Sequence, residues 1–252
     1  MPNAIDYKPD KRFFGLFVGR SGDGKSTALA SFPKKLLDLD FDFRFAGIAS
    51  AAKQGIISLD EIEYEQFNPR GGWDPIHNMN LQWDQWRMQG TFPYKTIGVE
   101  SITSLTRLIT LASHKEQKGK MIGKLRISGP GDFNFEAAGT HQFFDYLRIM
   151  PCNIIASAHI VDRYGKRPGA SEYAPAEVIG EKLSIRDNLG ENVLTYFDNV
   201  FRFSRSVSDG KTKYYVNFAT DIAKNSYGIQ PGEHDITGKN FYDYFTELIK
   251  EK

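Results

Sequence analysis

A glycine-rich stretch at residues 19–26 constrains the fold of this chain more than any other feature. It reads Gly-Arg-Ser-Gly-Asp-Gly-Lys-Ser and matches the whole eight-position pattern G-x-x-x-x-G-K-[ST]. An apolar run at residues 13–18 precedes it, and a short helical stretch follows and ends at Pro33. In such a strand–loop–helix unit, backbone N–H groups and the helix N-terminus bind phosphate oxygens. The motif therefore predicts an α/β fold with a nucleoside triphosphate site.

The residues of this phosphate loop have expected roles in binding ATP. Lys25 is predicted to contact the β- and γ-phosphates, and the hydroxyl of Ser26 is predicted to bind Mg²⁺. The residues expected to contact the nucleotide are Gly19, Ser21, Gly22, Asp23, Gly24, Lys25, Ser26 and Thr27.

Carboxylates end two further apolar segments, and hydrolysis needs such groups. Glu100 ends residues 96–100, so it is the candidate second group for Mg²⁺, acting through a water or with shifted geometry because Asp is commoner there. Asp38 and Asp40 lie in the strand predicted at residues 36–40, and its alternation places both on one side. Spacing alone does not decide which of the two activates water, and Asp42 could be an exposed loop residue. If Asp40 is the base, Asp40→Asn lowers kcat by at least ~10²-fold.

His159 follows a third buried strand, predicted at residues 153–158. A polar side chain at that position can contact the γ-phosphate and respond to its presence. His159 is therefore a candidate sensor of the nucleotide.

The overall composition excludes several classes of protein. The 252 residues include 32 Lys and Arg against 31 Asp and Glu, so any contact with nucleic acid has to be local. The single Cys152 cannot form an internal disulfide, which indicates a reducing compartment. The first ten residues lack the apolar segment of a signal peptide, and no apolar run reaches 18 residues, so we expect no membrane contact and a cytoplasmic location.

Strand and helix signals alternate from about residue 13, which favours one α/β domain. Helices are predicted at residues 76–88, at 102–112 with Ser101 as the cap, and at 135–150. Strands at 199–206 and 213–220 flank an Asp-Gly turn. We expect a single domain over residues 1–252 with a core at about 12–228, a C-terminal β-hairpin and a terminal helix at about 240–250.

Together these motifs resemble the RecA-type ATPase core, and more closely the small core-only RecA-like ATPases of bacteriophages linked to single-strand annealing and recombination. The resemblance covers roughly residues 12–228 and depends on residues 19–27, 37–40, 94–105, 158–159 and 223–228. It implies a RecA-like P-loop NTPase core with a mostly parallel central sheet flanked by helices. It also implies ATP and Mg²⁺ as cofactors, assembly into a homo-oligomeric ring or filament, and the cytoplasm of a bacterial host.

The resemblance also implies roles for three residues. Asp40 corresponds to the water-activating carboxylate, and His159 to a polar sensor at the mouth of a mobile DNA-binding loop. Lys224 corresponds to a cation that reaches the nucleotide of the neighbouring subunit. The sequence departs from the family pattern at Glu100, which replaces Asp, and at residues 225–226, where Asn-Ser replaces an acid and an Arg.

Two segments are predicted to be loops that face single-stranded DNA. Residues 113–128 carry five basic residues against one acidic residue, and residues 161–188 are too long for an ordinary connection. We expect phosphate contacts that depend on salt, and a second loop that becomes ordered with ATP and DNA. The expected DNA-binding residues are Lys115, Lys118, Lys120, Lys124 and Arg126 in the first segment, and Arg163, Lys166 and Arg167 in the second.

The leading functional hypothesis is a RecA-like ATPase that controls annealing or strand exchange on single-stranded DNA, with a single-strand-binding protein as a further candidate partner. One alternative is a phage DNA motor or helicase-type subunit, and another is a nucleotide-held switch with slow turnover. A nucleotide kinase is disfavoured, because no compact cluster of arginines in the sequence fits an acceptor-covering lid.

Overall fold

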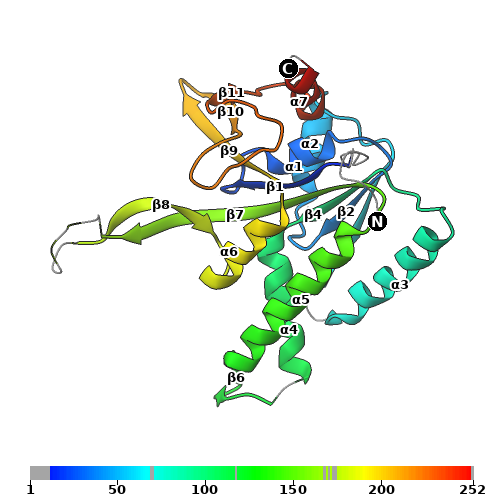
Figure 1. The fold of residues 1–252 in the computed structure, drawn as a ribbon, viewed down its shortest axis with the longest axis vertical. Coiled ribbons are helices and arrows are strands. Elements are labelled where there is room, and N and C mark those ends of the chain that lie inside the picture. Colours follow the sequence, from blue (N-terminus) through cyan, green and yellow to red (C-terminus); the bar gives the residue numbers. More distant parts are fainter. Residues whose placement is uncertain are drawn as a thin grey trace, which may run out of the picture.

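The computed structural model describes residues 12–68, 71–116, 118–166, 169, 171 and 175–250. Its centre is a nine-stranded sheet in the order β11-β10-β9-β1-β7-β4-β2-β3, with β8 paired to β7 outside this path (Figure 1). The strands of this sheet are β1 (Phe14–Gly19), β2 (Leu36–Asp40), β3 (Ile62–Gln66), β4 (Thr96–Glu100), β7 (Asn153–Gly165), β8 (Glu177–Leu183), β9 (Asn199–Ser208), β10 (Lys211–Asn217) and β11 (Glu233–Asp235).

Helices cover both faces of this sheet (Figure 1). They are α1 (Lys25–Ala30), α2 (Ala46–Lys53), α3 (Asp74–Met88), α4 (Ile102–Glu116), α5 (Pro130–Arg148), α6 (Asp187–Tyr196) and α7 (Phe241–Lys250). A separate two-stranded sheet consists of β5 (Met121–Ile122) and β6 (Leu125–Arg126). Among the described residues, no helix is long and apolar enough to span a membrane.

The central strands are parallel, and this brings the candidate site residues to one edge. Strand β1 pairs in parallel with β7 and β9, and β4 does so with β2 and β7. Gly19 is in register with His159, and Asp40 is in register with Glu100. Ligands bind at this carboxyl edge in open α/β sheets. The mostly parallel RecA-like P-loop fold predicted from the sequence is confirmed.

Both faces of the central strands are buried, as expected for a parallel sheet between helical layers. In β1, Leu16 packs into the core beneath α3, α4 and α5, whereas the neighbouring Phe17 packs into the core beneath α1 and α7. The second core is rich in rings, and Phe17 stacks on Phe201 with centroids 5.8 Å apart. This double burial explains why the strands appear in the sequence as continuous apolar runs.

Several predicted elements are present with shifted ends. The helix expected at 135–150 is α5 and begins at Pro130, because the Asp132 carboxylate accepts a hydrogen bond of 2.8 Å from the Gly129 N–H and caps the first turn. The predicted C-terminal hairpin is β9–β10, and its turn residues Asp209 and Gly210 both have positive φ, as a two-residue hairpin turn requires. The terminal helix is α7.

The two segments predicted to be loops instead form two projections (Figure 1). In the first, α4 continues to Glu116, and β5 and β6 form a small hairpin before α5 begins. We call residues 116–130 the α4–α5 tip. In the second, β7 continues past His159 and pairs antiparallel with β8. We call the described part of residues 160–183 the β7–β8 arm.

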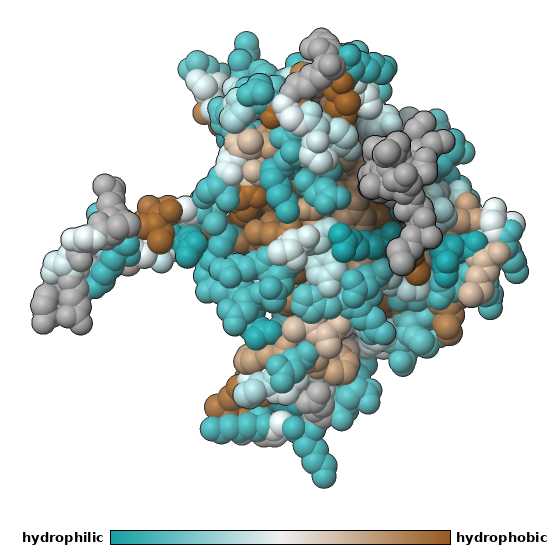
Figure 2. Space-filling view, viewed as in Figure 1, coloured by the Kyte–Doolittle hydropathy of each residue, from teal (hydrophilic) through white to brown (hydrophobic). Residues whose placement is uncertain are grey.

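Both projections expose large apolar side chains. On the α4–α5 tip these include Ile122 and Leu125, and on the β7–β8 arm Tyr164 and Val178. Figure 2 shows hydrophobic patches among hydrophilic side chains on both projections. Exposed strands with both faces in solvent carry no alternating pattern, which is why the sequence indicated loops at both places.

Candidate nucleotide site

The phosphate loop has the shape that its sequence predicts. It connects β1 to α1, and Gly22 and Gly24 adopt φ values of 84° and 91°, a region that glycine enters without steric strain. Lys25 is buried, and its Nζ donates to the carbonyl oxygens of Gly19 at 3.0 Å and Arg20 at 2.9 Å. Burial lowers the pKa of Lys25, although the negative charge of Glu100 opposes this. The amine is thus held inside the loop, where a phosphate would replace the carbonyl contacts.

Ser26 and Glu100, the two predicted Mg²⁺ ligands, are in direct contact. The Ser26 hydroxyl donates to Oε2 of Glu100 at 2.8 Å, and Oε1 of Glu100 is buried without a hydrogen-bond partner. Glu100 is 7% exposed, and burial raises its pKa while the hydroxyl of Ser26 and the charge of Lys25 act against that rise. A hydroxyl and a carboxylate with a spare oxygen are suitable donors for Mg²⁺.

The protein alone does not form a complete metal site in the part of the chain that the structure describes. No group of three or more His, Cys, Asp or Glu side chains there is placed to hold a metal ion. Mg²⁺ in nucleotide sites is commonly held by one or two protein oxygens together with substrate phosphates and waters. Ser26 and Glu100 fit that arrangement.

Asp40 has a different environment from the one expected of a catalytic base. It is 1% exposed, and its Oδ1 accepts hydrogen bonds from the backbone N–H groups of Asp42 and Arg44, each at 3.1 Å. Its Oδ2 accepts one from Nε2 of Gln66 at 2.9 Å. Both oxygens are therefore engaged, Oδ1 with the turn after β2 and Oδ2 with the end of β3.

Asp38 lies two residues before Asp40 in β2 and is also buried. Its Oδ1 has no hydrogen-bond partner, and burial raises its pKa well above the ordinary value, with the charges of Glu100 and Asp40 adding to the rise. Neither Asp38 nor Asp40 lines the cavity over the phosphate loop. The open choice between these two carboxylates thus gains a third candidate, Asp42.

Asp42 lines the cavity, although the sequence pattern allowed an exposed loop residue at this position. Its side chain is 6% exposed, with Oδ1 accepting from the Ser101 hydroxyl at 3.1 Å and Oδ2 lying 3.3 Å from Nε2 of His159. Burial raises the pKa of Asp42, but hydrogen bonds from His159, Ser104 and Ser101 outweigh it and lower the pKa overall. The sequence contained one signal for this position. The alternation of acidic and apolar residues that includes Asp38 and Asp40 continues to Asp42, which places all three acids on the same side.

The cavity over the phosphate loop has a volume of about 530 Å³. The loop forms its floor, and Asp42, Glu100 and His159 lie at one part of its wall. Apolar side chains, among them Ile56 and Ile236, line other parts. This combination of one polar, phosphate-binding region and an apolar remainder suits a nucleotide.

Among the described residues Arg20 belongs to the phosphate loop, and three arginines approach it from other segments, namely Arg44, Arg202 and Arg205. Nη1 of Arg44 donates to the Ser21 hydroxyl at 3.1 Å, and Nε of Arg205 lies 3.9 Å from an oxygen of Asp23. No compact cluster of arginines is visible in the sequence, and the arrangement of these four around the loop depends on the fold. Arg20 belongs to the loop, Arg44 follows β2, and Arg202 and Arg205 lie three residues apart on β9, so the tertiary fold brings separate segments together.

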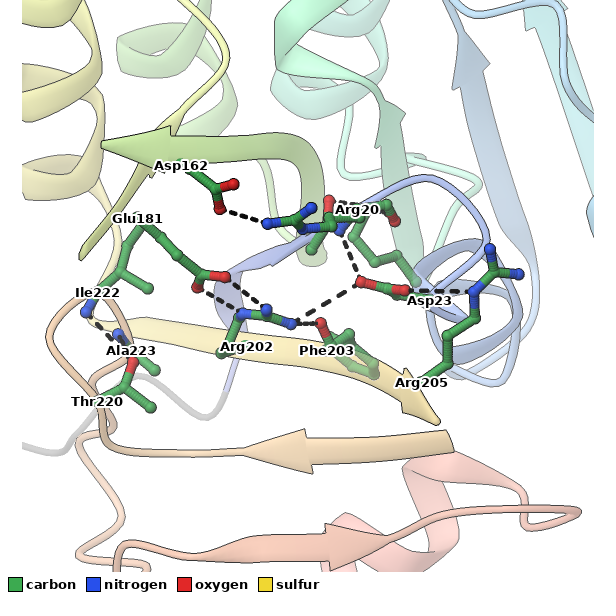
Figure 3. A network of polar contacts seen from close by, with 12 residues as sticks. Arg20, Asp23, Asp162, Glu181, Arg202, Phe203, Arg205, Thr220, Ile222 and Ala223 are labelled. Atoms are coloured by element: carbon green, nitrogen blue, oxygen red, sulfur yellow. Dashed lines mark hydrogen bonds and ion pairs between the residues drawn. The ribbon is translucent and has the colours of Figure 1, made fainter. Parts of the chain in front are cut away.

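Two of these arginines connect the loop to the β7–β8 arm (Figure 3). Arg20 is ion-paired with Asp162 of β7. Arg202 binds both carboxylate oxygens of Glu181 of β8 and lies 3.8 Å from Asp23 of the loop. The nucleotide site and the arm therefore share one network of charged groups.

Of the remaining predicted site residues, Lys224 lies away from the cavity. Lys224 is exposed, and its backbone pairs with Val200, which is in register with Leu16 in the middle of the sheet. Its action on a neighbouring subunit stays a prediction. Thr27 and His159 line the cavity, as expected.

The predicted DNA-binding residues lie on the two projections. Lys118, Lys120 and Lys124 are exposed on the α4–α5 tip. Arg126 is engaged instead with Asp132 at 2.8 Å and has a side chain only 13% exposed, so its assignment as a DNA contact is corrected.

The other basic residues have mixed positions. Lys115 is exposed near the end of α4, with its Nζ 3.3 Å from where a side chain at Gly72 would begin. Arg163 and Lys166 are exposed on the β7–β8 arm. Arg167 lies outside the described residues.

The fold and the site define a P-loop ATPase domain with a RecA-like core. A family profile described as an AAA domain matches residues 13–230, and the chain belongs to this family. No curated protein matches the chain. The crystal structure of a KaiC-like protein from the hyperthermophilic archaeon Pyrococcus horikoshii is similar at 12% identity with a TM-score of 0.46, over 88% of this chain and 84% of that one.

Proposed function

We propose that this protein hydrolyses ATP and acts on single-stranded DNA as an oligomer, in phage recombination or annealing. One observation carries the proposal: strand β7 passes the nucleotide cavity at His159 and continues into the β7–β8 arm with Arg163 and Lys166. A change at the γ-phosphate can therefore reach the β7–β8 arm along one continuous strand.

ATP and Mg²⁺ are the cofactors of this proposal. The loop N–H groups and Lys25 would bind the phosphates, while Ser26 and Glu100 would hold Mg²⁺, which supplies charge neutralisation on the phosphate oxygens. The apolar part of the cavity would receive the base.

Single-stranded DNA is the proposed partner, because exposed lysines and apolar side chains occur together on the projections. Lys118, Lys120 and Lys124 offer contacts to phosphates, and Tyr164 offers a ring on which a base can stack. The role in phage recombination or annealing, in a bacterial cytoplasm, depends on the resemblance of the sequence to the core-only phage ATPases. Assembly is supported by Lys224, which is exposed and does not line the cavity of its own chain.

The test is ATP hydrolysis by the purified protein at low and moderate salt, with and without single-stranded DNA. We expect stimulation by DNA that weakens with salt and that disappears when Lys118, Lys120 and Lys124 are all changed to alanine. A matched control removes three exposed lysines elsewhere, Lys95, Lys211 and Lys250, and should keep the stimulation. Lys25→Ala should abolish turnover. Turnover that depends on Lys25 but ignores DNA at low salt would overturn the DNA assignment and leave the ATPase.

A second candidate function is a nucleotide-held switch with slow turnover. It is favoured by the position of Asp40, whose two oxygens are engaged in hydrogen bonds and which does not line the cavity, so it is not placed to activate a water there. Tight ATP binding with negligible hydrolysis in the presence of DNA, together with altered hydrogen exchange in the β7–β8 arm, would select this function.

A further inference from the structure

The turn after β2 is built so that Arg44 lies over the phosphate loop. Asp40 ends β2, the strand between β4 and β3, and its carboxylate is buried. This carboxylate accepts hydrogen bonds from the N–H groups of Asp42 and Arg44, and they anchor the turn to β2. Phe43, between them, has a φ of 57° and reverses the chain. The guanidinium of Arg44 then reaches the hydroxyl of Ser21 at 3.1 Å. Both residues line the nucleotide cavity.

Arg44 differs from the other arginines near the loop in its partner. Arg20 and Arg202 are paired with the carboxylates of Asp162 and Glu181. The hydrogen bond of Arg44, in contrast, is to a neutral hydroxyl. A guanidinium carries five N–H donors, and an anion is a stronger acceptor than a hydroxyl, so the contact with Ser21 can yield to a phosphate.

The negative charges around the cavity favour a further cation such as the guanidinium of Arg44. Asp42 and Glu100 bring negative charge to the wall of the cavity, and a triphosphate brings more. Lys25 is the buried cation of the loop itself. In phosphoryl transfer the charge spreads over the oxygens of the transferred group, and an arginine beside them is worth 10³–10⁵ in rate in enzymes that use one.

We propose that Arg44 is a further catalytic residue, which contacts the γ-phosphate of ATP bound to its own subunit and stabilises the charge that develops during transfer. This inference rests on the proposed ATP hydrolysis. In that step a water oxygen forms a bond to the γ-phosphorus, and the bond from that phosphorus to the bridging oxygen breaks. The electron pair leaves on ADP, and the proton of the water passes to solvent. Arg44 gains or loses no proton.

The first arm of the test compares Arg44→Ala and Arg44→Lys with Arg107→Ala, a control at an exposed position on α4. We expect Arg44→Ala to lower kcat by at least ~10²-fold with less than a ~5-fold change in KM, partial activity in Arg44→Lys, and parent activity in Arg107→Ala. Thermal melting checks that all variants fold. A rise in KM with unchanged kcat would mean that Arg44 binds the ground state and the transition state equally, and it would overturn the inference.

The second arm is independent of turnover. Binding of ADP with Mg²⁺ is measured by calorimetry with and without aluminium fluoride, which mimics the transferred phosphoryl group. The parent should bind ADP more tightly with the fluoride, and Arg44→Ala should lose that gain while binding ADP alone as the parent does. An equal gain in both proteins would overturn the inference.

The third arm separates action within a subunit from action between subunits. Lys25→Ala and Arg44→Ala proteins are mixed, so that each kind of subunit lacks one function. If Arg44 serves its own subunit, no subunit in the mixture has a complete site and activity stays absent. Restored activity would place Arg44 in a neighbouring site and overturn the inference. If the unmodified protein does not hydrolyse ATP at all, both the proposed function and this inference are wrong. If it hydrolyses ATP and the Arg44→Ala variant is equally active, only the inference about Arg44 is wrong.

Discussion

Arg202 binds Glu181 through two hydrogen bonds of 2.7 and 2.6 Å, and this pair joins strand β9 to the β7–β8 arm directly beside the phosphate loop. The same guanidinium lies 3.8 Å from Asp23 in the loop. Both partners are mostly buried, with side chains 17% and 23% exposed, so water screens the pair only in part. Arg202 thus holds the base of the arm and also interacts with the negative charge of Asp23 in the loop.

The first prediction concerns the stability of the arm. Glu181→Gln removes the charge of this pair, so the arm should open more often. We expect the amides of residues 177–183 to exchange about 10-fold faster, which corresponds to about 1.4 kcal/mol and is typical of a lost charge-assisted pair. Hydrogen exchange followed by mass spectrometry measures it.

A matched control for this prediction lies next to Glu181 in β8. Lys182 forms an ion pair of 2.7 Å with Asp187, but the two side chains are 41% and 67% exposed. Such exposed pairs contribute at most about 1 kcal/mol and often much less. Lys182→Ala should therefore leave exchange close to that of the parent. Equal effects of the two substitutions would show that Arg202 does not hold the arm.

The second prediction ranks the carboxylates after β2. Asp42 lines the cavity beside His159, whereas Asp40 holds the turn through Oδ1 and binds Gln66 of β3 through Oδ2. Asp42→Asn should therefore lower kcat by about 10²-fold or more if Asp42 orients or deprotonates the water. Asp40→Asn keeps one acceptor for the turn and should lower kcat less.

The comparison is made at saturating ATP and at two pH values. Because the pKa of Asp42 is lowered, the carboxylate stays ionised below the ordinary value of 3.8, and its protonation should not limit the rate between pH 5 and 8. A larger loss of kcat in Asp40→Asn than in Asp42→Asn would restore Asp40 as the catalytic carboxylate, as the resemblance to the phage ATPases implied.

The sequence predicted the local parts of this site and missed the parts that depend on tertiary structure. Lys25 and Ser26 follow from a strand–loop–helix unit whose geometry is local, and Glu100 follows from the rule that parallel strands present their carboxyl ends at one edge. Arg44, Arg202 and Glu181 come together only when the sheet assembles, and no spacing in the chain connects them. Their positions could not be predicted from the sequence alone.

The projections show a second limit of sequence patterns. The buried strands were found because both faces are apolar, and the hairpin turn at Asp209 because its residues are specific to positive φ. The β7–β8 arm and strand β3 expose most of their residues, so hydrophobic periodicity gave no signal for either. These strands pair through backbone hydrogen bonds, which depend little on the identity of the side chains. Composition therefore gives almost no indication of their pairing.

The third prediction concerns the buried Asp38. Burial raises its pKa, so the folded protein keeps this proton to a higher pH than the unfolded chain does. Above the ordinary value of 3.8 the unfolded chain ionises first, and stability falls with rising pH until the folded pKa is passed. The slope for one proton is at most about 1.4 kcal/mol per pH unit.

Asp38→Asn removes this titration while it keeps the shape of the side chain. The variant should gain stability relative to the parent as the pH rises from 5 to 8, and urea unfolding at both values measures the difference. A constant difference across this range would mean that Asp38 is ionised in the folded protein throughout. Because Asp38 does not line the cavity, ATP binding should change little.

The fourth prediction concerns Asp132, which supports the α4–α5 tip. Its carboxylate accepts hydrogen bonds from the Gly129 N–H at 2.8 Å, the Ser113 hydroxyl at 2.7 Å and the Arg126 guanidinium at 2.8 Å. These contacts, with the backbone N–H of Gly129 first, lower the pKa of Asp132 to about 2. Asp132→Ala should destabilise the protein by about 3 kcal/mol at pH 7, because it leaves the buried Arg126 without its counter-charge.

The pH dependence of this loss has a definite sign. A lowered pKa means that the carboxylate stabilises the folded state at all pH values above the ordinary 3.8, and that this contribution disappears as the pH falls toward 2. The difference between the parent and Asp132→Ala should therefore shrink between pH 5 and 3 in denaturant titrations. Asp187→Ala is the matched control, because Asp187 is also in the first turn of a helix but is 67% exposed, and it should cost at most about 1 kcal/mol. If Asp132→Ala were no more destabilising than Asp187→Ala, Asp132 would not hold the tip, and Arg126 would again be available as a contact for DNA.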